Sequence, residues 1–358
     1  CCLSGVFYRR LEPTSATFSP QCLLFMVSIA AGVYMPIITK TSKPVFMQRY
    51  PIFFFVLSLI YLQSCEAQKD KSGKVIDTPT TGSIRIMVDE GYEPIIESSI
   101  DVYDSIYRQA KITPIYTSEG EAVNAILRDS IQVIIISRKL TDNEMKFFTQ
   151  RGFTPPVTPI AHDAVAFILN PANTDTVFTT SQMHDILNGK FTKWNQVNPR
   201  SKLNDIRVVF DNPLSGTLTY VKDSILAGAA LTPNASALKT NAEVIAYVGK
   251  NKNAIGIIAA NWISDTDDRG VQKFRREIRI ADIAKSVGAE GFGPYQAYLA
   301  TGDYPYKRTI YIINAQARKG LGLGFASFLA GDQGQRIVLK DGLLPAQAPT
   351  RLIKATRE

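Results

Sequence analysis

Hydrophobic and polar residues alternate in two kinds of stretch through most of the chain after residue 82. Short runs rich in Ile, Val, Phe and Tyr are typical of buried strands, whereas apolar residues spaced three and four positions apart are typical of amphipathic helices. The strand-like runs lie at 84–88, 111–116, 132–136, 162–170, 253–258 and 304–313. Because helical patterns separate the first three runs, the sequence predicts an α/β fold with a mainly parallel sheet covered by helices.

Helix-start signals support this order of strands and helices. Pro94 suits the first turn of a helix after the first run, and Ser118 with Glu121 forms a capping-box signature before the next helix. Two further amphipathic helices are predicted near the end of the chain, at 317–329 and 333–339. In open α/β sheets ligands bind at the carboxyl ends of the strands, so we expect a site in the polar loops there.

The stretch 208–221 contains a β-branched run, a turn, and then Ser215, Gly216 and Thr217 at the start of a helical pattern. The apolar positions of that helix are Leu218, Val221 and Ile225. The first N–H groups of a helix have no partner within it and lie at the positive end of its dipole, so an oxyanion can bind there. Gly216 allows a ligand to approach the backbone closely. The alternative is that Ser215 is simply the N-cap of the helix.

Composition and charge narrow the function. The chain has 358 residues, 45% of them hydrophobic and 20% charged, which is enough for one large or two medium cores. Of the net charge of +8, the first 64 residues contribute five basic residues against one acidic residue, and no basic block interleaves with aromatics. We therefore expect no nucleic-acid partner. His162 and His184 have no second His or Cys at ligand spacing, so we expect no metal and no cofactor.

The first fifth of the chain resembles a targeting segment. The apolar run 51–62 is too short to span a bilayer and follows a short basic stretch, so 47–64 is predicted to be a lipoprotein signal peptide. Leu62-Gln63-Ser64-Cys65 resembles a lipobox, which makes Cys65 the expected lipidated residue; an ordinary secretion signal is the alternative. Residues 1–46 are interpreted as a mis-called N-terminal extension, and 65–82 as a flexible tether.

Four motifs occur in the order found in one known family. They are the helix, Gly-Lys turn and Trp of 182–194; Ser215-Gly216-Thr217; Tyr304-Pro305 with Arg308; and Gly334-Gln335 with Gly342 and Pro345. Together they make residues 82 to 346 resemble the phosphate-binding proteins of ABC transporters, which belong to the type II periplasmic binding protein superfamily. The resemblance implies two lobes, each a mainly parallel sheet flanked by helices, joined by crossover strands at 162–170 and 306–313. Lobe I would comprise 83–165 and 306–358, and lobe II 166–305, with hinge closure around the ligand.

The resemblance also implies a ligand shell. Its residues are Gly91, Tyr92, Ser118, Ser137, Arg138, Asp211, Ser215, Gly216 and Thr217. The best-known branch of the family has an Asp where Arg138 stands and an Arg where Asp211 stands, and the first loop offers Asp89 and Glu90 instead of small residues. We hypothesise that Arg138 donates to the anion and that Asp211 accepts the proton of hydrogen phosphate. The alternative is that these two residues pair with each other and latch the closed cleft.

The resulting hypothesis is an extracytoplasmic lipoprotein that binds inorganic phosphate and delivers it to an ABC transporter permease. It would be monomeric, attached to the membrane through its lipid anchor, and would make or break no bond. Alternatives of the same class are a binding protein for sulfate or molybdate, or an envelope phosphate sensor. A hydrolase is disfavoured because Ser215 has neither a nearby His nor a Gly-x-Ser-x-Gly motif.

Overall fold

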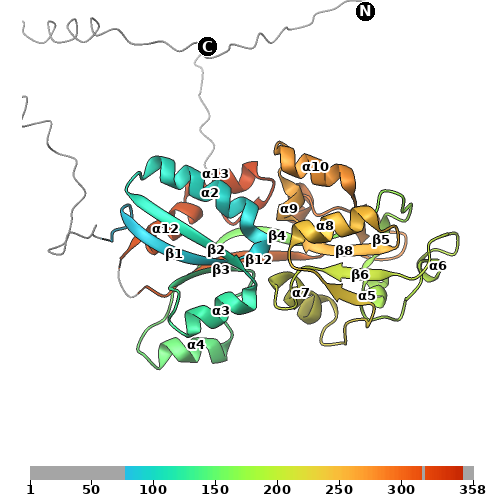
Figure 1. Ribbon diagram of the computed structural model, residues 1–358, viewed down its shortest axis with the longest axis horizontal. Helices are drawn as coiled ribbons and strands as arrows, with labels where there is room; N and C mark the ends of the chain where they lie inside the picture. The colour runs from blue at the N-terminus through green and yellow to red at the C-terminus, as the bar shows by residue number, and fades with distance from the viewer. Residues whose placement is uncertain (1–76, 317–318, 350–358) are drawn as a thin grey trace, which may run out of the picture. The chain divides into compact units, whose positions relative to one another are not determined.

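The computed structural model describes residues 77–316 and 319–349 of the chain (Figure 1). The predicted extension, the signal peptide, Cys65 and most of the tether therefore lie outside the described residues. None of the helices in the described ranges has both the length and the apolar character that a bilayer crossing requires.

Eight strands follow one another as hydrogen-bonded neighbours in the order β2-β1-β3-β12-β4-β8-β6-β7. We call the elements around the first three strands lobe I and those around the last three lobe II. Lobe I contains β1 (Gly82–Asp89), η2 (Glu90–Tyr92), α2 (Glu93–Ile106), β2 (Ala110–Thr117), α3 (Glu119–Leu127), β3 (Val133–Ile136), α4 (Asp142–Thr149), α12 (Leu321–Ala330), α13 (Asp332–Lys340) and β13 (Leu344–Pro345). Its strand β1 pairs in parallel with both β2 and β3.

Lobe II is built in the same way, with β6 pairing in parallel with both β7 and β8. It contains α5 (Thr180–Leu187), α6 (Trp194–Val197), β6 (Arg207–Phe210), α7 (Gly216–Tyr220), η3 (Val221–Ile225), β7 (Ala235–Ala237), α8 (Asn241–Lys250), β8 (Ala254–Ala259), α9 (Asn261–Ser264), α10 (Arg269–Glu277), β9 (Arg279–Ile280) and α11 (Gln296–Thr301). A small second sheet consists of β5 (Val177–Thr179), β10 (Asp282–Ala284) and β11 (Gly291–Phe292).

Two long strands pass between the lobes and pair with each other antiparallel: β4 (Val157–Leu169) and β12 (Lys307–Asn314). Strand β12 also pairs with β3 of lobe I, and β4 with β8 of lobe II. Along β4 the buried side chains belong to the lobe I core up to Ala161 and to the lobe II core from Ala164. Asp163 lies between these positions and faces Arg308 of β12 in the strand register. This polar pair therefore lies where one hydrophobic core gives way to the other.

The helix predicted to begin near Ser215 is present, but its second half differs from the prediction. Helix α7 continues directly into η3, a π-helix, because Tyr220 between them keeps helical dihedral angles. Val221 and Ile225 remain buried in the lobe II core despite the wider turn. The helical segment 216–225 is thus ten residues long, with its N-terminal end in the space between the lobes.

Several predicted boundaries were wrong by a few residues, including that of the strand expected at 162–170, which is β4 (Val157–Leu169). The last strand begins at Lys307 rather than at 304, because Pro305 has no N–H to donate to a neighbouring strand. The helix expected from 317 begins at Leu321, whose N–H donates to Asp77 Oδ1 at 2.8 Å.

Candidate ligand-binding site

Ser215, Gly216 and Thr217 form the start of α7 and are called the α7 N-terminus below. Ser215 caps the helix, because its Oγ accepts the Leu218 N–H at 3.2 Å. The same hydroxyl donates to Asp211 Oδ1 at 2.6 Å, which fixes its orientation. The residue is 1% exposed. Capping, the alternative reading of Ser215, is therefore present, and it holds the other two residues in position.

Gly216 makes a direct backbone contact with lobe I. Its N–H donates to Asp89 Oδ2 of lobe I at 2.8 Å. A Cβ atom at this position would lie 2.5 Å from Asp89 Oδ2 and 2.7 Å from Glu119 Oε2, and it would also overlap the Ser137 hydroxyl. Since real Cβ atoms do not come so close to other heavy atoms, only glycine allows these lobe I side chains to contact the α7 N-terminus.

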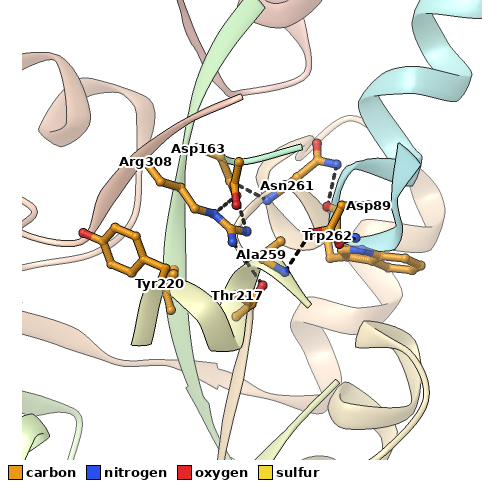
Figure 2. A network of polar contacts seen from close by, with 12 residues as sticks. Asp89, Asp163, Thr217, Tyr220, Ala259, Asn261, Trp262 and Arg308 are labelled. Atoms are coloured by element: carbon orange, nitrogen blue, oxygen red, sulfur yellow. Dashed lines mark hydrogen bonds and ion pairs between the residues drawn. The ribbon is translucent and has the colours of Figure 1, made fainter. Parts of the chain in front are cut away.

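Arg308 on β12 supplies a buried positive charge beside Thr217. Its Nε and Nη2 donate to Asp163 Oδ2 at 3.2 and 2.9 Å, and its Nη1 donates to Thr217 Oγ1 at 3.2 Å. Figure 2 shows Arg308 between these two partners. Burial alone would lower the pKa of Arg308, but Tyr92, Asp163 and Asp89 raise it above its ordinary value, so the guanidinium stays charged. The sequence pattern marked Arg308 only as part of a family motif.

Tyr92 contributes an unused hydroxyl to the same region. Its ring lies against Arg308, with the guanidinium carbon 5.1 Å from the ring centroid. The side chain is fully buried, and its hydroxyl has no hydrogen-bond partner within the described part of the chain. A buried polar group without a partner is costly, so a bound ligand or water is the expected partner. The preceding residue, Gly91, is held by its own bonds: its N–H donates to Asp89 Oδ1 and its carbonyl accepts Asn261 Nδ2–H at 3.2 Å.

Three carboxyl groups near the α7 N-terminus bind protons more tightly than usual. Burial, followed by the charges of Glu119 and Asp211, raises the pKa of Asp89 to about 8. Burial raises the pKa of Asp211 to about 6 although the Ser215 hydrogen bond opposes the shift. Burial also raises the pKa of Glu90 to about 7, against the opposing hydrogen bonds from Asn241. Near neutral pH Asp89 is therefore mainly protonated, Glu90 is about half protonated and Asp211 is mainly ionised.

Arg138 lies against acidic residues of its own lobe. Its Nε donates to Glu119 Oε1 at 3.0 Å, and its Nη1 and Nη2 donate to the two carboxylate oxygens of Glu144 at 2.8 and 2.9 Å. Glu119 in turn accepts the Ser137 N–H and hydroxyl at 2.9 and 2.6 Å. Asp211, the partner in the latch alternative, instead accepts hydrogen bonds from Ser215 and Asn241. Arg138 thus reaches the α7 N-terminus through Glu119.

The structure brings most of the predicted shell together. Residues from both lobes that meet at or beside the α7 N-terminus are Gly91, Tyr92, Ser137, Asp211, Ser215, Gly216 and Thr217. Ser118 caps α3 in the predicted capping box, with its Oγ accepting the Glu121 N–H. Sequence reasoning did not assign Asp89, Glu119 or Arg308 to the shell. No group of three or more metal-binding side chains occurs in residues 77–316 or 319–349.

Further hydrogen bonds connect the two lobes around this centre. The Gly120 N–H donates to the Leu214 carbonyl at 3.0 Å, and the Asn241 N–H donates to Glu90 Oε1 at 3.1 Å. Trp262 Nε1–H donates to the Glu90 carbonyl at 3.3 Å. Lobe I thus contacts lobe II through the loop after β1 and through the start of α3.

Two lobes on crossover strands, with polar groups from both meeting at one helix start, define a two-lobed binding protein. A family model described as a PBP superfamily domain matches residues 74–333, and the chain belongs to this superfamily.

Curated relatives and solved structures agree with this family. The chain is 24% identical over 261 residues to the phosphate-binding protein PstS of Pseudomonas aeruginosa, an alignment that covers 69% of this chain and 77% of the relative. It is 26% identical over 221 residues to PstS of Staphylococcus epidermidis, covering 61% and 64%. A Clostridium perfringens structure with bound phosphate, described as a phosphate ABC transporter substrate-binding protein, aligns with TM-score 0.63 and 20% identity over 74% of this chain and 100% of that one. A phosphate transport receptor from Vibrio cholerae aligns with TM-score 0.56 and 19% identity, again over 74% and 100%.

These findings confirm the fold class and the family resemblance. They also confirm a binding protein rather than an enzyme, because the family and its relatives are binding proteins. The residue boundaries of the lobes and the membership of the ligand shell stay predictions.

Proposed function

We propose that this protein binds inorganic phosphate at the α7 N-terminus, between its two lobes, and delivers it to the permease of an ABC transporter. The observation that carries the proposal is the convergence of the Gly216 N–H, the charged Arg308 and the unused Tyr92 hydroxyl on one buried region. Helix N-termini and guanidinium groups both favour oxyanions. The names of the curated relatives point to the same ligand.

In this proposal the ligand shell supplies donors from both lobes. Lobe II offers the Gly216 N–H and the hydroxyl of Thr217, and lobe I offers the hydroxyl of Tyr92, while the Ser137 hydroxyl already donates to Glu119. Arg308 provides the positive charge, which replaces the role first assigned to Arg138. Asp211 remains the acceptor for the proton of hydrogen phosphate. The lobes close on the ligand because neither lobe holds the full set of donors.

The buried carboxyl groups favour phosphate over sulfate. Sulfate carries no proton near neutral pH, so it would leave Asp211 facing an anion without a shared hydrogen. Sites built around a required hydrogen bond can discriminate against a ligand that lacks it by a factor of about 10⁴ or more. Molybdate and sulfate are therefore the informative competitors.

We further infer that the protein acts outside the cytoplasm as a monomer anchored by lipid at Cys65. The support is the lipobox-like Leu62-Gln63-Ser64-Cys65, which lies outside the described residues, and the binding-protein family. The part of the predicted tether before Asp77, whose Oδ1 accepts the Leu321 N–H of lobe I, would let the domain reach a permease in the same membrane. An envelope phosphate sensor would use the same site without a permease.

Isothermal titration calorimetry with phosphate, sulfate and molybdate tests the proposal. Phosphate should bind, and Gly216→Ala should weaken it by about 10- to 150-fold, because the added Cβ displaces the contacts of one charge-assisted hydrogen bond worth about 1.5–3 kcal/mol. Gly270→Ala is the matched control, since Gly270 lies in α10 away from these residues. Absence of phosphate binding by the folded parent protein would overturn the proposal.

A further inference from the structure

The Asp89 carboxylate makes the contact with the α7 N-terminus that the proposed function assigns to phosphate. Its Oδ2 accepts the Gly216 N–H at 2.8 Å, and its Oδ1 accepts the Gly91 N–H at 3.1 Å. The residue is 1% exposed, so these bonds are not shared with bulk water. A carboxylate at the start of a helix is stabilised by the same dipole and N–H groups that stabilise an oxyanion.

Space around Gly216 is too limited for both anions. Asp89, Glu119 and Ser137 already lie so close to its Cα that a single added carbon would overlap all three. A phosphate oxygen that accepts the Gly216 N–H must therefore take the place of Asp89 Oδ2. Binding requires the Asp89 side chain to leave that N–H.

The charges that face Asp89 determine how easily its carboxylate can leave the Gly216 N–H. Glu119 of α3 and Asp211, which follows β6, repel an ionised Asp89, whereas Arg308 of β12 attracts it. The remaining neighbours are the Gly91 N–H of its own loop, the Gly216 N–H of α7 and the phenol of Tyr92. Arg308 is also shared with Asp163 of β4, and Arg138 lies on the far side of Glu119. An arriving phosphate would add further negative charge to this acidic surrounding.

We propose that Asp89 is an internal competitor for the α7 N-terminus and that oxyanion binding is coupled to protonation of Asp89. This inference rests on the proposed function and adds to it that Asp89 takes up a proton when the anion binds. The proton comes from solvent and binds the carboxylate, which removes one negative charge and weakens its bond to the Gly216 N–H. The resulting carboxyl O–H is a donor for an oxygen of the bound anion, so one proton is taken up for each anion bound when Asp89 begins ionised.

The charges around Asp89 support a coupling in which anion binding favours protonation of its carboxylate. Burial, then Glu119 and Asp211, raises the pKa of Asp89 to about 8. Below this pH Asp89 is already neutral, so its protonation no longer affects affinity. Above it, coupled uptake of one proton makes the association constant fall by up to tenfold for each pH unit. Phosphate itself also titrates, but that contribution is common to all variants and cancels in comparisons between them.

Calorimetric titration of the full chain with inorganic phosphate between pH 6 and pH 10 tests this coupling. Asp89→Asn keeps the size of the side chain and removes its charge. We expect the ratio of its association constant to that of the parent to rise about tenfold between pH 6 and pH 9. Titrations in two buffers of different ionisation enthalpy should show the parent taking up nearly one proton more than Asp89→Asn at pH 9.

Glu90→Gln is the matched control. It removes another buried carboxylate of the same loop, but one that accepts hydrogen bonds from Asn241 rather than from Gly216. Above pH 8 its pH dependence should follow that of the parent. Asp89→Ser, a shorter polar replacement, serves as the second variant if Asp89→Asn does not fold, as judged by a thermal melt.

The outcomes separate the two proposals. If phosphate binds at pH 6 but parent and Asp89 variants share one pH slope and one proton count, the competitor role is wrong and the proposed function stands. If neither the parent nor a folded Asp89 variant binds phosphate at any pH, the proposed function fails and this inference with it. Phosphate binding by the parent that becomes weaker than that of the Asp89 variants only above pH 8 would support the competitor role directly.

Discussion

The ion pair between Asp163 and Arg308 gives a sharp prediction about stability. Both side chains are almost fully buried, at 0% and 2% exposure. Asp163→Asn keeps the shape of the side chain and an oxygen that can still accept the Asn261 N–H. It removes the negative charge that accepts hydrogen bonds from Arg308 Nε and Nη2, at 3.2 and 2.9 Å. Because a guanidinium does not deprotonate in proteins, the variant leaves a buried positive charge without its counter-ion.

Breaking a buried pair on one side costs about 3–5 kcal/mol, so Asp163→Asn should lower the free energy of unfolding by that amount. Urea denaturation followed by circular dichroism measures the loss. Asp332→Asn is the control, because its pair with Arg336 is about half exposed, at 44% and 50%, and exposed pairs contribute about 0–1 kcal/mol. A loss below about 1 kcal/mol for Asp163→Asn would refute the reasoning that the pair is buried and coupled.

A double variant separates stability from binding. Replacing both members by apolar residues, Asp163→Leu with Arg308→Met, should recover much of the lost stability, since buried ion pairs are often replaceable by packed apolar side chains. It should still bind phosphate at least about tenfold more weakly than the parent, because the site loses its charge-assisted donor. A double variant that binds phosphate normally would show that Arg308 does not contact the ligand.

Two further predictions concern residues first identified from the sequence. Arg138→Gln should weaken phosphate binding by about tenfold, because Glu119 beside Gly216 loses its neighbouring cation. Glu144→Gln should bind phosphate within about threefold of the parent. Calorimetry measures both affinities, and equal affinities would limit Arg138 to a structural role. Cys65→Ser should abolish metabolic lipid labelling and release or stall the protein, because stable anchoring requires acyl chains; unmodified parent protein with a different N-terminus would contradict the lipobox interpretation.

Local signals in the sequence predicted local structure well. The capping box at Ser118 and the helix start at Ser215 both depend on bonds within three residues, and both are present. The strand-like runs were found because their side chains are buried on both faces, as in β3, where all four residues are buried. Such features need no knowledge of distant partners.

The partners of the charged side chains could not be predicted from such local signals. Arg138 was placed near the anion by family geometry, but a bidentate partner on α4 and Glu119 on α3 determine where its guanidinium lies. Arg308 was read as part of a motif because its partner Asp163 is 145 residues away in the chain. Asp89 was noted only as a departure from the usual loop composition, because its contact with the Gly216 N–H joins residues 127 positions apart in the chain.

The position of Arg308 on a crossover strand has a consequence for how anions enter. Asp163, which binds the guanidinium, lies on the neighbouring crossover strand, so both members of the ion pair belong to the strands that connect the lobes. If the lobes open as proposed, the distances from Arg308 to the donors of each lobe would change, whereas its pairing with Asp163 would stay the same. The positive charge of Arg308 would then attract an anion before the lobes close, and changes in the loops of one lobe would alter selectivity without moving that charge.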